Sequence, residues 1–203
     1  MNSDPTLLWR ALAGGTFFAA LAYYDWRKHP GNPRRVKEYG FLFGVTMLAM
    51  AYGVLHDIIT YHLSPAYYIY GKGLASAQDG FNADVVTLAL KATWTAGLIG
   101  AVALLLANNP HPLWPQLPYV RLAAFAAVPF STSIGAEWSF GAVTWWCSSA
   151  LRAHLELPPP TSLIDNRFLV VAGMHWGAYL GGALGVAAAC WLIRRQRWRL
   201  SAI

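Results

Sequence analysis

Five long runs of apolar residues, separated by charged or proline-rich stretches, dominate the pattern of this chain. A helix needs about 20 mostly apolar residues to cross a bilayer, and each run reaches that length. We therefore predict an all-α fold, a polytopic membrane helix bundle of five transmembrane helices, with residues 1–203 forming a single transmembrane domain. The predicted spans are residues 6–26, 39–62, 83–107, 119–148 and 168–193.

The fourth run is longer than one membrane crossing requires, and Pro129 lies within it. Proline lacks the amide hydrogen that the helix interior uses, so it bends or breaks a helix. We expect a kink at this point, or a short interfacial helix that leads into the span.

The fifth run contains a glycine at every fourth position, at Gly177, Gly181 and Gly185. Residues at this spacing share one face of a helix. Small residues on one face let two helix backbones approach closely in a membrane. This stripe therefore predicts a helix-packing surface.

Lysine and arginine are distributed unevenly between the two sides of the five-span arrangement. Cytoplasmic loops of membrane proteins carry an excess of these residues. One side carries ten of them, namely Arg27, Lys28, Arg34, Arg35, Lys37, Arg121, Arg194, Arg195, Arg197 and Arg199. The other side carries three, namely Lys72, Arg152 and Arg167. We therefore predict a cytoplasmic C-terminus, an N-terminus outside, and a location in the bacterial inner (plasma) membrane.

The first run has an alternative interpretation as a cleaved signal peptide. The sequence from Ala20 to Ala22 resembles the small-residue site at which such peptides are cut. Against this alternative, Asp4 offsets the positive charge of Arg10, so the basic segment that precedes a signal peptide is weak.

The composition agrees with a membrane environment. Apolar residues make up 56% of the chain and charged residues 12%, whereas soluble domains carry roughly 25% charged residues. The ten Trp and ten Tyr residues suit the two membrane interfaces. The net charge of +6 comes from loops that anchor topology, so we expect the lipid bilayer as a partner and no nucleic acid. Assembly into a homo-oligomer or a larger membrane complex stays open.

Ionisable side chains inside the predicted spans are the candidates for function, because charges in lipid are costly and normally face the bundle interior. They are His56, Asp57, Lys91, Glu137 and His175. A helix rises about 1.5 Å per residue, which places His56, Lys91 and His175 each roughly 10 Å below the outer end of its span, and Glu137 about 17 Å below. We therefore expect a buried polar layer in the outer half of the bilayer.

Two imidazoles and a carboxylate are an ordinary ligand set for a transition metal. We expect His56, Glu137 and His175 to hold the metal, with Asp57 as a further ligand or as a partner that orients a ring. Asp57 or Lys91 would transfer protons in a membrane enzyme. Such an oxidoreductase or hydrolase would act on a lipophilic small molecule.

Other interpretations of the same residues stay open. His56 and His175 could ligate a haem from its two faces. The polar layer could form the proton or cation path of a small transporter or channel. It could also hold helices together in an accessory subunit, with Lys91 paired to Glu137 or Asp57. The spacing does not select among these functions.

One segment resembles a family of uncharacterised bacterial multi-pass membrane proteins that carry the pattern H-D-Q-x-T-Y-T-x-S-P-E-Y-F. The matching residues are His56, Asp57, Thr60, Tyr61, Ser64, Pro65 and Tyr67. Ile58 replaces the glutamine, Ala66 replaces the glutamate, and His62 stands where threonine is usual. A second piece of that family is similar to His175, Tyr179, Gly181 and Gly182. The resemblance implies a multi-pass helical protein and no particular activity.

Overall fold

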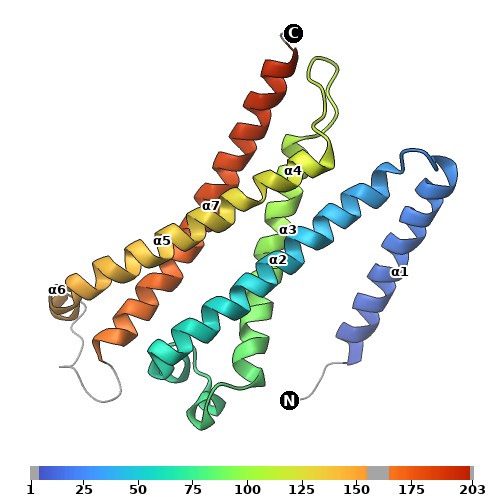
Figure 1. Ribbon diagram of the computed structural model, residues 1–203. Helices are drawn as coiled ribbons and strands as arrows, with labels where there is room; N and C mark the ends of the chain where they lie inside the picture. Colours follow the sequence, from blue (N-terminus) through green and yellow to red (C-terminus); the bar gives the residue numbers. More distant parts are fainter. Residues whose placement is uncertain (1–4, 155–164, 202–203) are drawn as a thin grey trace. The chain divides into compact units, whose positions relative to one another are not determined.

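The computed structural model describes residues 5–154 and 165–201, and within them all regular elements are helical. The order along the chain is as follows (Figure 1): α1 (Pro5–Lys28), α2 (Arg34–Leu63), η1 (Tyr67–Gly71), η2 (Ala75–Asp79), α3 (Ala83–Ala107), α4 (Tyr119–Phe125), α5 (Ala127–Trp146), α6 (Ser148–His154) and α7 (Asn166–Ser201). The short element η1 is a π-helix and η2 is a 3₁₀-helix. The predicted all-α class is confirmed for the described residues.

Among the described residues, three helices are long and apolar enough to cross a membrane: α2, α3 and α7. The helices α1 and α5 are not among them. In α5, polar residues such as Ser131, Thr132 and Ser133 interrupt the apolar sequence. The count of five spans therefore stays a prediction, while a helical protein with three candidate spans is supported.

Two helices extend beyond the predicted spans. Helix α2 begins at Arg34, ahead of the predicted residue 39, and α7 continues to Ser201, past the predicted residue 193. Arginine and lysine end an apolar run, but both are good helix formers. Hydropathy therefore marks where a span ends without marking where its helix ends.

The fourth apolar run is divided at Ala126 into α4 and α5, and α6 begins at Ser148. Pro129 explains the position of the break. Its missing amide hydrogen leaves the carbonyl of Phe125 without its usual helical partner, and its ring collides with that carbonyl. The expected interruption is confirmed, and it lies one turn before the proline.

The chain divides into two compact units, Met1–Gly44 and Val45–Ile203. In the first unit, a short turn joins α1 to the beginning of α2. The Asp25 carboxylate accepts a hydrogen bond from the backbone N–H of Arg35 (2.8 Å) and lies 3.3 Å from the ring of His29. Phe18 contacts Tyr39 edge to face, with ring centroids 5.3 Å apart. These contacts fix the turn.

In the second unit, α5 and α7 lie side by side over most of the length of α5 (Figure 1). A Cβ atom added at Gly177 would overlap the backbone oxygen of Ala136, and one added at Gly181 would overlap that of Thr132. Only glycine permits this approach of the two backbones, so the predicted packing stripe is confirmed.

Glycine also brings α2 and α3 together in the second unit. A Cβ at Gly53 would overlap the side chain of Thr93. One at Gly97 would lie 2.7 Å from the Cβ of Ala49. The half of α2 that carries the candidate site residues is therefore held firmly against α3.

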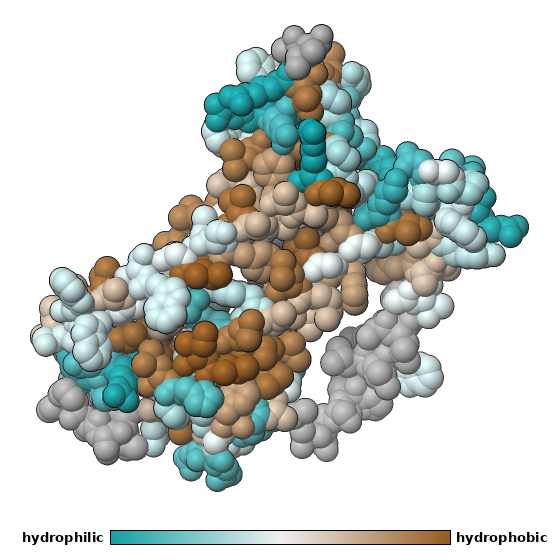
Figure 2. All heavy atoms as spheres, viewed as in Figure 1, coloured by the Kyte–Doolittle hydropathy of each residue, from teal (hydrophilic) through white to brown (hydrophobic). Residues whose placement is uncertain are grey.

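The surface of the second unit is banded (Figure 2). Hydrophilic residues gather toward its two ends, and apolar residues occupy the face between them. Many large apolar side chains of the second unit are exposed, among them Ile99 (63%), Leu106 (64%) and Leu184 (60%). An apolar surface of this kind is typical of helices that face lipid.

Candidate metal centre

Three buried side chains from two helices meet inside the second unit. Helix α2 supplies His56 and Asp57, and α7 supplies His175. One ligand atom of each residue lies within 4.8 Å of the others. Neighbouring residues on a helix point about 100° apart, so His56 and Asp57 leave α2 in different directions. They belong to one site because each of them contacts His175.

The distances suit one shared ion. Nε2 of His175 lies 3.5 Å from Oδ1 of Asp57, and Nε2 of His56 lies 4.0 Å from the same oxygen. Ligand atoms about 2.1 Å from a tetrahedral metal stand about 3.4 Å from one another. The two histidine rings meet edge to face with centroids 4.5 Å apart. Their proximity is expected from the similar depths of the two residues in the predicted spans.

His175 is held in the tautomer that a metal ligand requires. Its Nδ1 lies 2.9 Å from the backbone oxygen of Val171, one turn earlier on α7. A carbonyl oxygen only accepts, so Nδ1–H is the donor. The Nε2 lone pair is then free and directed toward Asp57.

Among the described residues, the buried imidazole of His56 has no hydrogen-bond partner at either ring nitrogen. Its Nδ1 lies 3.0 Å from Oε1 of Glu137 on α5, but the direction of the N–H does not meet the oxygen. Buried polar atoms are satisfied in the great majority of cases. An imidazole left unsatisfied at the centre of a ligand cluster indicates a site for an ion.

Glu137 is buried, but it is not one of the three residues whose ligand atoms converge. Its Oε1 contacts Nδ1 of His56, and its Oε2 accepts a hydrogen bond from the hydroxyl of Tyr52 (2.8 Å). A carboxylate beside the second nitrogen of a histidine orients that ring for a metal. The three ligand atoms that lie close enough to share one ion therefore include one from Asp57, where the sequence predicts Glu137.

Tyr52 is missing from the sequence-based candidates because a tyrosine in a span is usually a packing residue. Its position could have identified it, because Tyr52 precedes His56 by one helical turn and so lies on the same face of α2. The Tyr52 hydroxyl fixes Glu137, and Glu137 in turn lies against His56. The side chains of Tyr52, Glu137 and His56 therefore form a continuous series of polar contacts that leads away from Asp57.

The π-helix η1 covers the cluster. The Tyr67 ring lies 4.7 Å from the ring of His175. Thr60 donates to the backbone oxygen of His56 (2.8 Å), so the Tyr68 hydroxyl is the donor in its 2.7 Å contact with Thr60. Burial raises the pKa of Tyr68, which keeps it a neutral donor. The sequence analysis expects only a loop here, because π-helices have no simple sequence signature.

Lys91 is not brought to the cluster. It lies on an exposed face of α3. The depth of a residue along its helix does not determine the direction in which its side chain points. A role for Lys91 in proton transfer therefore has no geometric support in this structure.

The geometry also argues against a haem between His56 and His175. Two axial imidazoles bind a haem iron from opposite faces of a flat macrocycle. Here the two rings contact each other edge to face at 4.5 Å. No macrocycle fits between them in this arrangement.

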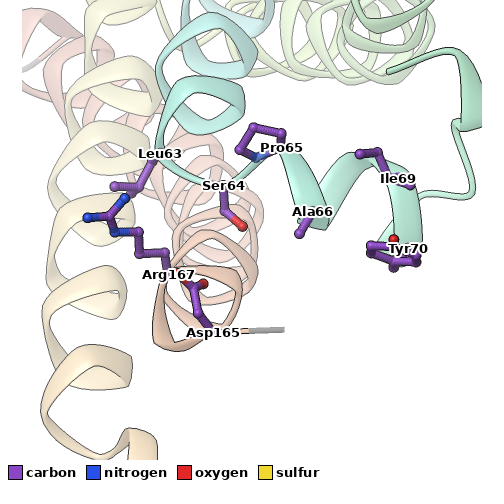
Figure 3. Close-up of a pocket in the computed structure, with 8 residues that line it drawn as sticks. All are labelled: Leu63, Ser64, Pro65, Ala66, Ile69, Tyr70, Asp165 and Arg167. Carbon is purple, nitrogen blue, oxygen red and sulfur yellow. The ribbon is translucent and has the colours of Figure 1, made fainter. Parts of the chain in front are cut away.

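A separate pocket of about 270 Å³ lies beyond the end of α2, between η1 and the start of α7. Its polar lining comes from Ser64, Asp165 and Arg167 (Figure 3). None of the three converging metal-ligand candidates lines it. The pocket and the buried cluster are therefore distinct features.

No family model, no curated protein and no solved structure matches this chain. The function proposed below is therefore inferred from the geometry of the buried cluster.

Proposed function

We propose that this protein is an integral membrane metalloprotein in which His56, Asp57 and His175 bind one divalent transition-metal ion. The convergence of their three ligand atoms within 4.8 Å, in a buried position, carries this proposal. Two imidazole nitrogens and one carboxylate form the ligand set of catalytic zinc and non-haem iron sites. Three protein ligands leave a further position open for water or a substrate.

The chemistry of such a centre favours a membrane enzyme, a hydrolase or an oxidoreductase that acts on a lipophilic substrate. A bound divalent metal supplies Lewis acidity and lowers the pKa of a coordinated water. The carboxylate of Glu137 lies 3.0 Å from Nδ1 of His56, a position from which a carboxylate can orient a metal-ligating ring. The enclosure of the site by helices and by η1 limits its access to bulk water, which suits a substrate that partitions into lipid.

A proton or cation transporter is the alternative function. The series of contacts from His56 through Glu137 to Tyr52 supports a transporter, because polar groups in contact can pass a proton along α2. Metal binding by the purified protein distinguishes the metalloprotein from a proton transporter.

We also propose that α1 and α5 cross the membrane with α2, α3 and α7, which gives five spans with the N-terminus outside and the C-terminus in the cytoplasm. The distribution of lysine and arginine supports this orientation. We propose the bacterial inner membrane as the location. In this orientation the metal centre lies in the outer half of the bilayer.

The first prediction concerns His175→Ala. After loading with Zn²⁺ and dialysis, the wild-type protein should retain about one zinc ion per chain, as three protein ligands can hold it. The variant should retain none that elemental analysis detects, because its remaining imidazole and carboxylate are a poor site. His62→Ala is the matched control, since His62 is exposed on α2 and should not affect zinc content. Equal zinc in the two variants, or none in the wild type, would contradict the metal proposal.

The second prediction separates the roles of Glu137 and Asp57. Because Glu137 orients His56 and does not face the ion, Glu137→Gln should weaken zinc affinity by about 10- to 100-fold. Asp57→Asn should abolish binding, because it removes the charged ligand. A chelator dye in competition with the protein measures both affinities, and Asp79→Asn on the exposed part of η2 is the control. If both variants lose zinc equally, Glu137 is itself a ligand.

A further inference from the structure

A second group of polar side chains surrounds His175 on the side of η1. The ring of Tyr67 lies 4.7 Å from the His175 ring, and the ring of Tyr179 lies 6.3 Å from it. The Lys72 ammonium lies 5.4 Å from the centroid of the Tyr67 ring. Two phenols and an ammonium are thus gathered beside one metal-ligand candidate, and the proposed metal centre does not use them.

Lys72 is a half-buried cation, and no carboxylate of the described residues forms an ion pair with it. Asp57 and Glu137 together balance a divalent metal, so within the described residues the ammonium of Lys72 stays uncompensated. An unpaired charge out of water is costly, and an anion bound next to the metal would neutralise it.

The two tyrosines are hydrogen-bond donors at neutral pH. A phenol keeps its proton at neutral pH and can donate it in a hydrogen bond. Burial alone would lower the pKa of Lys72, but the phenol groups of Tyr179 and Tyr67 act on the ammonium and raise it above its ordinary value. The group therefore offers one positive charge and two neutral O–H donors, which together suit an oxyanion.

The same group lies next to an apolar surface. Tyr179 is 51% exposed on α7, and its neighbours Trp176 and Leu180 are 69% and 46% exposed. Helix α7 is a candidate span, so this face is available to acyl chains. A ligand that fits both the polar group of Lys72, Tyr67 and Tyr179 and the apolar face of α7 has an anionic headgroup and an apolar tail.

We propose that Lys72, Tyr67 and Tyr179 bind the headgroup of an anionic amphiphile and hold it beside the metal centre. The inference rests on the proposed metal function and names its substrate class, an amphiphile with a phosphate or carboxylate headgroup. The tail extends along Trp176 and Leu180, and the headgroup oxyanion is bound by the ammonium and the two phenols.

The experiment uses the full chain in an uncharged maltoside detergent after loading with zinc. Calorimetric titration with dodecyl phosphate should show binding that Lys72→Gln weakens about tenfold, as expected for the loss of one charge-assisted contact. Zinc content should not change. Lys28→Gln is the matched control, because Lys28 also lies over a tyrosine ring, that of Tyr24 at 5.9 Å. It should bind dodecyl phosphate as the wild type does.

Three results would overturn the amphiphile site. They are equal affinity in Lys72→Gln and the wild type, equal weakening in Lys28→Gln, and inorganic phosphate binding as tightly as dodecyl phosphate, which would indicate a site for a free anion. Lys72→Arg should retain binding, which separates charge from folding. If the wild type holds no zinc but its affinity for dodecyl phosphate still depends on Lys72, the metal function fails while the headgroup site stands.

Discussion

Gly181→Leu should prevent α7 from packing against α5 and leave little folded protein. A Cβ at this position would overlap the backbone oxygen of Thr132 and lie 2.7 Å from the Cβ of Ala136. The opposing atoms belong to a continuous helix and cannot move aside individually. Overpacking, with the backbone shifts that it forces, typically costs about 1–3 kcal/mol and occasionally more. The yield of monodisperse protein and the thermal unfolding midpoint in detergent measure the effect.

Gly135→Leu is the control for this result. It introduces the same side chain on α5, where an added Cβ meets no atom within 4 Å. This variant should unfold close to the wild-type temperature. Equal unfolding temperatures for the two leucine variants would show that the contact between α5 and α7 does not depend on Gly181.

Arg197→Ala should destabilise the protein by about 3 kcal/mol or more, because four backbone carbonyls lose a charged donor, and hydrogen bonds to charged groups contribute about 1.5–3 kcal/mol each. The guanidinium donates to the backbone oxygens of Ala107 (2.6 Å), Asn109 (2.6 Å), Pro115 (3.0 Å) and Trp114 (3.1 Å). Its side chain closes the loop between α3 and α4 onto α7. Thermal unfolding and proteolysis of that loop should both report the loss.

Two further variants test this account of Arg197. Arg197→Lys should restore little of the stability, because one ammonium cannot reproduce the fork of donors that a guanidinium presents. Arg199→Ala removes an exposed arginine from the same helix and should have almost no effect. A stable Arg197→Ala protein with a protease-resistant loop would contradict the role of the guanidinium.

The sequence predicts the helices and part of the site, because apolar length and helical rise are local properties. Depth along α2 and α7 brings His56 and His175 to the same height, and their rings are in contact. Depth does not specify the rotation of each helix about its axis. For that reason Lys91 falls on an exposed face of α3, and Glu137 contacts the far nitrogen of His56.

Arg197 illustrates a second limit of local patterns. Its sequence surroundings are basic, which marks it as a surface charge that anchors topology, yet its exposed fraction is 3%. Only the folded loop between α3 and α4 reveals its partners, since they lie more than 80 positions away along the chain. No pattern within α7 contains that information.

The contact between Arg197 and Ala107 spans 90 positions of sequence, and this has a consequence for biosynthesis. Chains emerge from the ribosome N-terminus first, and their early segments begin to fold before the later ones are made. The residues at the end of α3 are synthesised long before the arginine that donates hydrogen bonds to their carbonyls. The turn after α3 therefore reaches its final hydrogen-bonded form only after Arg197 has been synthesised.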